Sequence, residues 1–171
     1  LEVIKKDKKN FEVILLSAKN NYKKLIEQAK EFKAKNVQIN NKSFYKLVKN
    51  ALKKTKTKVF TQEQSLTKII KIKIDYTMSA VVGLAGLQPT IDAIKISKIV
   101  AIANKETIIC GWNLIEKELK KFKSSFIPVD SEHFSIWSLL NNSKNLDVEK
   151  IIITASGGPF IDLPTKKFKN I

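Results

Sequence analysis

Short runs rich in β-branched residues alternate with longer segments of helical periodicity, and this alternation constrains the fold more than any other feature of the chain. We expect strands at Phe11–Ser17, Asn36–Ile39, Lys58–Phe60, Tyr76–Val82, Ile99–Ile102, Ser125–Val129 and Lys150–Thr154. We expect helices at Tyr22–Phe32, Ser43–Lys53, Gln62–Ile70, Pro89–Ser97, Ile108–Lys121 and Glu132–Leu140. The pattern predicts an α/β fold with a doubly wound, mainly parallel sheet.

Within these expected strands, the runs Val13–Leu16 and Ile99–Ile102 are apolar without alternation, as strands covered on both faces are. Sheets of this kind bind ligands at the carboxyl ends of their strands. Functional residues are therefore expected directly after Ser17, Val82, Ile102 and Val129.

The formal charge of +16 raises the possibility of a basic nucleic-acid-binding module. All 32 basic residues are lysines, however, and nucleic-acid recognition relies heavily on the guanidinium fork of arginine. Lysine is absent from Tyr76–Ile94, Ser124–Ser143 and Ile151–Thr165. We interpret the charge as a solvated surface and expect no nucleic-acid partner.

Cys110 is the single cysteine, which excludes an internal disulfide framework and a multi-cysteine zinc site. No apolar run is long enough to span a membrane, and the N-terminus lacks the apolar segment of a secretory signal. We expect a cytoplasmic protein without a membrane partner.

The start of the chain lacks the first strand and glycine-rich turn of a Rossmann-like nucleotide-binding fold, because the first glycine is Gly83. We expect an N-terminal truncation. After the first expected strand comes Lys19-Asn20-Asn21, where NAD-binding folds usually hold a carboxylate for the ribose. A turn without an acid suits the 2′-phosphate of NADPH; an ordinary helix cap by asparagine is the alternative.

Two further strand ends carry candidate residues. Gly83 and Gly86 would let the backbone approach a ligand or a packing helix, although a tight strand-to-helix turn would use them equally well. In Ala103-Asn104-Lys105-Glu106, the lysine could hold a substrate phosphate or polarise a carbonyl, while Asn104 and Glu106 could contact a nucleotide. A surface ion pair of little energetic value is the alternative.

The segment Asp130-Ser131-Glu132-His133 follows the strand expected at Ser125–Val129. Two carboxylates two residues apart share a face in extended backbone, and oxygen ligands suit Mg²⁺ or Mn²⁺. A third ligand would have to complete the site, and helix capping by Asp130 or Ser131 is the alternative. Ser156, in Thr154–Phe160, could bind a phosphate or diol, or could belong to a simple Gly-Gly-Pro turn.

Together, Val82–Leu87, Ala103–Glu106, Pro128–His133 and Thr154–Phe160 resemble four signature stretches of the reductoisomerase family of the non-mevalonate isoprenoid pathway, in order and in spacing. The resemblance covers essentially the whole chain but not the whole enzyme. It implies a Rossmann-like NADPH-binding domain at 1–122 and the start of an α+β catalytic domain at 123–171.

The resemblance also implies a role for each candidate residue. Lys19, Asn20, Asn21, Asn104 and Glu106 would bind NADPH; Asp130 and Glu132 would bind Mg²⁺ or Mn²⁺; Lys105, Ser131, Glu132 and Ser156 would bind the substrate; and Lys105, Asp130 and Glu132 would be catalytic. The implied substrate is a phosphorylated sugar, 1-deoxy-D-xylulose 5-phosphate, and the implied assembly is a homodimer. We expect this piece alone to be inactive. A nucleic-acid-binding module and a non-catalytic nucleotide-binding domain remain the alternatives.

Overall fold

The computed structural model of the chain describes residues 1–141, 148–152 and 164. It divides into two compact units, Leu1–Val129 and Asp130–Ile171. The first unit contains two three-stranded sheets, and every strand pair in them is parallel. The expected parallel α/β fold is confirmed, with the strands grouped into two sheets.

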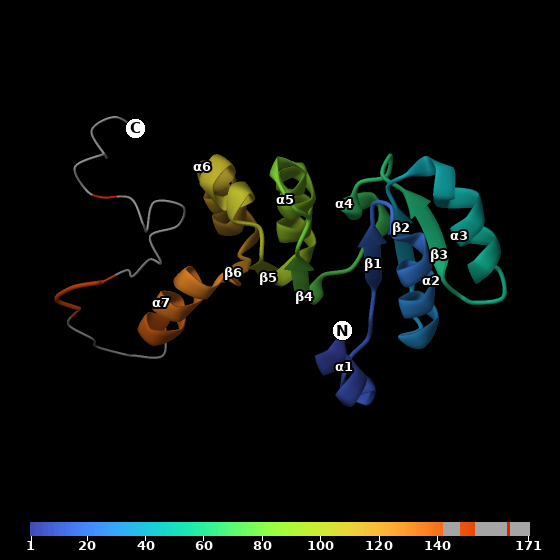
Figure 1. The fold of residues 1–171 in the computed structure, drawn as a ribbon, viewed down its shortest axis with the longest axis horizontal. Helices are drawn as coiled ribbons and strands as arrows, with labels where there is room; N and C mark the ends of the chain where they lie inside the picture. Colours follow the sequence, from blue (N-terminus) through green and yellow to red (C-terminus); the bar gives the residue numbers. More distant parts are fainter. Residues whose placement is uncertain (142–147, 153–163, 165–171) are drawn as a thin grey trace. The chain divides into compact units, whose positions relative to one another are not determined.

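The first sheet has the order β1 (Leu15–Ala18), β2 (Asn36–Ile39) and β3 (Lys58–Thr61). The helices α2 (Tyr22–Glu31) and α3 (Tyr45–Leu52) connect these strands and pack on them (Figure 1). A short 3-10 turn, η2 (Lys42–Phe44), precedes α3, while α1 (Glu2–Lys6) and η1 (Lys8–Asn10) precede the sheet. Each connection is the helical crossover that parallel strands require.

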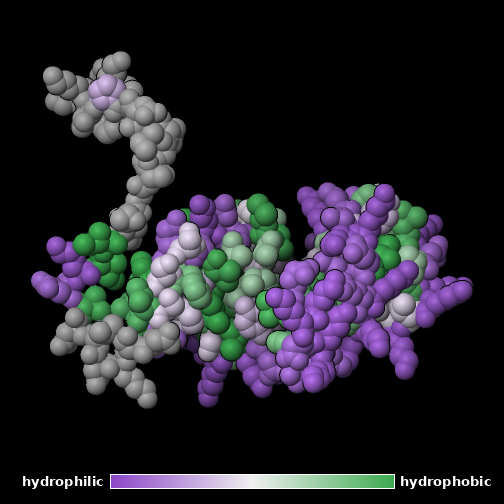
Figure 2. All heavy atoms as spheres, turned by 60° about the horizontal axis from the view of Figure 1, so that its bottom comes forward, coloured by the Kyte–Doolittle hydropathy of each residue, from purple (hydrophilic) through white to green (hydrophobic). Residues whose placement is uncertain are grey.

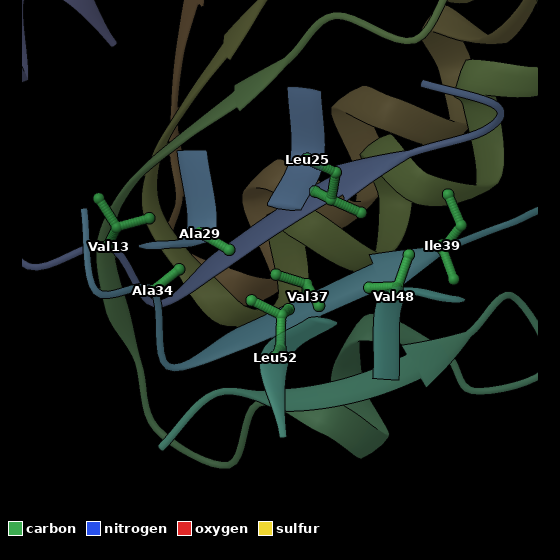
Figure 3. Close-up of a cluster of buried hydrophobic side chains, with 8 residues drawn as sticks. All are labelled: Val13, Leu25, Ala29, Ala34, Val37, Ile39, Val48 and Leu52. Atoms are coloured by element: carbon green, nitrogen blue, oxygen red, sulfur yellow. The ribbon is translucent and has the colours of Figure 1, made fainter. Parts of the chain in front are cut away.

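The core of this sheet forms because the central strand and the helices each contribute an apolar face. Val37 and Ile39 of β2 are fully buried, and Leu25, Val48 and Leu52 of the two helices close over them. Figure 3 shows these five side chains with Val13, Ala29 and Ala34 pointing into one cluster. Burying a side chain of this size contributes roughly 1.5–3 kcal/mol to folding.

The second sheet has the order β4 (Ile74–Ser79), β5 (Ser97–Ile102) and β6 (Ser125–Pro128). The short helix α4 (Leu66–Ile69) precedes it, η3 (Leu84–Gly86) and α5 (Leu87–Ile96) connect β4 to β5, and α6 (Lys105–Phe122) connects β5 to β6. Val100 and Ile102 of β5 pack with Ile94 of α5 and Ile115 of α6, and all four are buried. The register places Ile102 opposite both Ser79 and Pro128.

The second unit contains α7 (Ser131–Asn141). The strand expected at Lys150–Thr154 lies partly outside the described residues, and its described part, 150–152, has no strand structure. Five of the six expected helices begin at a different residue in the structure, α5 and α6 among them. Helix α5 begins at Leu87 because a proline is tolerated in the first turn, so Pro89 does not mark its start; α6 begins at Lys105 because Asn104 caps it.

Many of the lysines lie at the surface. Lys35 pairs with Glu12 at 2.7 Å and Lys98 with Asp75 at 2.7 Å, and all four side chains are more than half exposed. Hydrophilic side chains cover broad areas of the face in Figure 2, with hydrophobic residues in smaller groups. This distribution is that of a solvated lysine-rich surface.

Candidate functional site

The turn after β1 is held by asparagine side chains. The Asn21 side-chain oxygen Oδ1 accepts a hydrogen bond from the Lys24 backbone N–H at 3.1 Å and so caps α2. Asn41, after β2, donates from its side chain to Asn20 Oδ1 at 3.0 Å and from its backbone to the Lys19 carbonyl at 3.0 Å. The ends of two neighbouring parallel strands are thereby joined into one polar edge.

Lys19 gives this edge a positive charge. Its side chain is exposed, and no carboxylate forms an ion pair with it in the described part of the chain. The nearby acid Glu63 is bound to Lys42 at 2.5 Å, and this hydrogen bond and charge hold the pKa of the Glu63 carboxyl below its usual value. The expected turn without a free acid is therefore present, and Asn21 also fulfils the helix-cap alternative.

Asn104 is the most constrained of the candidate residues. It is 3% exposed, and its Oδ1 accepts from the Thr107 backbone N–H at 3.0 Å, which caps α6. Its Nδ2 donates to the Val81 carbonyl and, at 2.7 Å, to the Gly83 carbonyl. The loop after β4 and the first turn of α6 are thus fastened together.

The two glycines of that loop serve different needs. Gly83 has φ +71° and ψ −173°, a backbone conformation that residues other than glycine avoid. A Cβ at Gly86 would lie 2.5 Å from Asn104 Nδ2 and 2.6 Å from the Val81 carbonyl oxygen. The turn and the close packing of a helix end both account for these glycines.

Lys105 and Glu106 begin α6 and are exposed. Neither forms an ion pair with another residue in the described ranges, so the alternative of a surface pair is not what the structure contains. A lysine in the first turn opposes the helix dipole, which favours anions there. The N-terminus of α6 therefore presents an ammonium group and a carboxylate to solvent at the carboxyl end of β5.

Asp130 precedes α7 and accepts two hydrogen-bonding contacts on one oxygen. The His133 backbone N–H donates to Asp130 Oδ1 at 2.8 Å, and His133 Nδ1 lies 2.7 Å from the same atom. Burial alone would raise the pKa of the Asp130 carboxyl, but the hydrogen bonds from His133 outweigh burial and lower that pKa below its usual value. Asp130 is therefore a carboxylate near neutral pH.

The other oxygen, Asp130 Oδ2, is buried and has no hydrogen-bond partner among the described residues. A buried carboxylate oxygen without a donor is costly unless a cation or another ligand satisfies it. The residue thus caps α7 with one oxygen, while the other has no donor in this part of the chain. This feature fits the divalent metal expected from the sequence.

Glu132 does not share an extended face with Asp130, and that part of the sequence reasoning is wrong. Helix α7 starts at Ser131, so Glu132 lies in its first turn, where Ser131 Oγ donates to Glu132 Oε2 at 2.8 Å. Because Asp130 caps α7, the backbone becomes helical at Ser131, whereas the metal prediction assumed extended backbone from Asp130 to Glu132. Among the described residues, no group of three His, Cys, Asp or Glu side chains could hold a metal ion.

Topology relates these strand ends. Ile102 lies opposite Pro128 in the parallel pair β5–β6, and Asn104 and Asp130 each follow two residues later.

Ser156 lies outside the described residues. No helix in the described part of the chain is long and apolar enough to cross a membrane.

Several buried polar residues were not singled out by the sequence reasoning, among them Ser79, Thr90 and Thr107. Ser79 ends β4, Thr90 lies in α5 and Thr107 in α6. Hydroxyl residues are common in strands and near helix ends, so nothing in the sequence marked these three. Their burial depends on how the strand and the helices pack.

Comparison with known proteins identifies the family of the chain. The sequence model of 1-deoxy-D-xylulose 5-phosphate reductoisomerase matches residues 1–111, and that of the reductoisomerase C-terminal domain matches residues 126–171. The chain belongs to the 1-deoxy-D-xylulose 5-phosphate reductoisomerase family. The family resemblance expected from the four sequence stretches is confirmed.

Individual relatives support the same assignment. The reductoisomerase of Pelagibacter ubique (strain HTCC1062) is 57% identical over 173 residues, covering 100% of this chain and 45% of the relative. The solved reductoisomerase from Zymomonas mobilis in complex with NADPH is 33% identical, with a TM-score of 0.84 over 95% of this chain and 43% of that one. A second solved reductoisomerase, in complex with NADPH, fosmidomycin and magnesium, is 25% identical, with a TM-score of 0.81 over 99% of this chain and 44% of that one. The chain therefore spans less than half the length of these relatives.

Proposed function

We propose that the protein containing this chain converts 1-deoxy-D-xylulose 5-phosphate to 2-C-methyl-D-erythritol 4-phosphate, using NADPH and a divalent metal. The reaction is an intramolecular rearrangement, written as a retro-aldol step followed by an aldol step, and then hydride transfer to the new aldehyde. The observation that carries the proposal is the Asp130 carboxyl: hydrogen bonds from His133 keep it ionised, and its buried Oδ2 has no partner within the described part of the chain. The NADPH and magnesium complexes of the related structures support it.

The metal would be held by Asp130 and Glu132 together with ligands from elsewhere in the protein or from the substrate. Mg²⁺ or Mn²⁺ bound there would act as a Lewis acid toward the substrate's oxygens. Ser131 donates a hydrogen bond to Glu132 and so orients that carboxylate, and Ser131 and Glu132 would also bind the substrate. Capping of α7 by Asp130 fixes the backbone of all three residues.

Lys105 would bind the substrate and supply a second positive centre. Its exposed ammonium group has no ion-pair partner among the described residues, so a substrate oxyanion would not have to displace a carboxylate. Because β5 and β6 are parallel neighbours, Lys105 and Asp130 follow strand ends at the same edge of one sheet. We propose that Ser156 joins them at the substrate.

NADPH would bind along Lys19, Asn20 and Asn21 and along Asn104 and Glu106. Lys19 offers a cation for the 2′-phosphate, and the asparagine-bound turns offer polar backbone for the ribose and phosphates. Replacing Lys19 with Met should raise KM for NADPH several-fold while leaving KM for NADH nearly unchanged. Lys117→Met, an exposed lysine on α6, is the matched control.

A turnover assay on the full-length protein tests the proposal. NADPH should be oxidised only when 1-deoxy-D-xylulose 5-phosphate and a divalent metal are both present. Asp130→Asn and Glu132→Gln should each lower kcat/KM by on the order of 100-fold or more. Glu149→Gln, an exposed carboxylate in the same unit, should leave it unchanged.

Normal turnover in the Asp130 and Glu132 variants would refute the metal assignment. NADPH binding without dependence on metal or substrate would point instead to a non-catalytic nucleotide-binding domain. Salt-sensitive binding of DNA or RNA at physiological ionic strength would support the basic-module alternative. The homodimer and the cytoplasmic location implied by the resemblance are part of the same proposal and are tested by solution mass and by fractionation.

A further inference from the structure

Hydrogen bonds connect the end of β4 with α5 and, through the loop before α5, with the start of α6. Thr90 Oγ1 donates to the Gly86 carbonyl at 2.7 Å, and because its only proton is used there, Ser79 Oγ must donate to Thr90 Oγ1, also at 2.7 Å. Asn104 lies beyond Gly86, whose missing Cβ leaves the space that the amide occupies. Ser79, Thr90 and Asn104 are exposed by 6%, 0% and 3%.

Asn104 is the residue at which this network meets the loop. Its amide has two protons, and both are donated to backbone carbonyls, those of Val81 and Gly83. Its carbonyl oxygen accepts from the Thr107 backbone N–H. The side chain therefore has no proton left to offer a ligand.

The same bonds determine how the loop faces outward. Because the carbonyls of Val81 and Gly83 both turn toward Asn104, the residue between them is turned away, and Val82 is 87% exposed. Leu84, which follows the positive-φ turn at Gly83, is 60% exposed. Without the amide, the Val81 carbonyl would lose this donor and the Gly83 carbonyl would keep only the Gly86 backbone N–H, so neither bond would hold the loop to α6.

We propose that Asn104 is a positioning residue: it binds the loop Val81–Gly83 to the first turn of α6, so that the loop and the residues Lys105 and Glu106 face NADPH as one rigid edge. This inference rests on the proposed function, because it assigns the nucleotide to that edge. It replaces the side-chain contact with NADPH that the resemblance implies for Asn104, because both amide protons are donated to the loop and only the backbone of Asn104 would border the nucleotide. Preorganising a binding edge improves affinity by removing the cost of ordering it on binding.

Substitution can separate the two functions of the side chain. Serine is a good helix cap, so Asn104→Ser should keep the bond to the Thr107 N–H while losing both bonds to the loop. Aspartate has nearly the same shape and also caps, but it would place a carboxylate against two carbonyl oxygens. Asn113→Ser makes the same change at an exposed position of α6 and is the matched control.

The experiment measures steady-state kinetics and hydrogen exchange on the full-length enzyme. We expect Asn104→Ser to raise KM for NADPH roughly ten-fold, the equivalent of one or two lost hydrogen bonds, with kcat changed much less. Amide exchange should become faster in Val82–Leu84 but not within α6. Asn113→Ser should change neither measurement, and Asn104→Asp should reproduce both effects if the serine variant does not fold.

Each other outcome contradicts the inference. A raised KM with unchanged exchange in Val82–Leu84 would mean that Asn104 touches NADPH directly. Faster exchange with an unchanged KM would mean that the loop does not serve the nucleotide. If wild-type enzyme failed to oxidise NADPH, the proposed function would fail, whereas the exchange measurement would still test the loop attachment by itself.

Discussion

The close approach between Gly86 and Asn104 makes Gly86→Ala the sharpest single test of the second sheet. The added Cβ would lie 2.5 Å from Asn104 Nδ2 and 2.6 Å from the Val81 carbonyl oxygen, both far inside van der Waals contact. Neither neighbour can move freely, because the amide is hydrogen-bonded and the carbonyl belongs to the backbone. Either the turn shifts or Asn104 leaves its position.

The size of the effect follows from three contributions. Overpacking of this kind costs about 1–3 kcal/mol. Loss of the Asn104 bonds adds about 0.5–1.5 kcal/mol each. Gly86 has φ −77° and ψ −16°, which alanine adopts readily, so the stiffer unfolded chain offsets about 0.4–1 kcal/mol. We expect a net loss of about 2–3 kcal/mol in the free energy of unfolding.

Urea unfolding followed by tryptophan fluorescence measures this loss. Trp112 reports on the second sheet because its ring centroid lies 5.8 Å from that of Phe126 on β6, and Trp137→Phe removes the signal of the other tryptophan. Ala85→Ser, an exposed neighbour in the same turn, should shift the midpoint little. An unchanged midpoint for Gly86→Ala, or an equal shift for Ala85→Ser, would refute the close approach.

Three further predictions concern packing and charge. Ile115 is fully buried, so Ile115→Ala should lower the free energy of unfolding in urea by about 2–5 kcal/mol. Ile109 lies on the same helix but is 75% exposed, so Ile109→Ala should change it by less than about 0.5 kcal/mol. Thr107→Val should be neutral or stabilising, because Thr107 Oγ1 is buried without a partner; a loss above about 1 kcal/mol would reveal a hidden partner. The hydrogen bond and the charge of Lys5 lower the pKa of the Glu31 carboxyl. The pair therefore stabilises the fold at pH values above the usual carboxyl pKa, and this contribution is lost as the pH falls through the lowered pKa. Glu31→Gln should therefore flatten the acid side of a plot of urea midpoint against pH, and an unchanged slope would mean that the pair does not form in solution.

Local signals in the sequence were sufficient to predict most of the elements. The strand expected at Asn36–Ile39 has the observed bounds, because Val37 and Ile39 alternate with polar residues between two polar turns. Ends of helices were harder to place. Helix α6 begins three residues before the expected Ile108, since the cap at Asn104 draws two charged residues into the first turn.

The candidate site was predicted from topology, but its internal contacts were not. Asn104 could be selected because it follows a buried strand, yet its bonds reach Val81 and Gly83, more than 20 residues earlier in the chain. The bond between Ser79 and Thr90 likewise joins a strand to a helix. Such contacts depend on how two elements pack, and no periodicity in the sequence records that packing.

Helix capping and ligand binding are usually weighed as competing explanations for a polar residue after a strand, but here the same residues can do both. Asn21, Asn104 and Asp130 follow β1, β5 and β6, and each accepts the backbone N–H three residues ahead. The cap fixes the start of the helix and so fixes where the neighbouring residues project. A cap therefore does not argue against a functional strand end.

Asp130 differs from the other two caps because it has a buried oxygen without a partner among the residues that the structure describes. Asparagine caps as well as aspartate, so Asp130→Asn should leave α7 and the unfolding midpoint nearly unchanged while removing the charge that a metal needs. Asp130→Ala should lose both, lowering stability by about 1 kcal/mol as well as activity. If Asp130→Asn lost stability in proportion to activity, the carboxylate would be structural, and the metal would have to be held elsewhere.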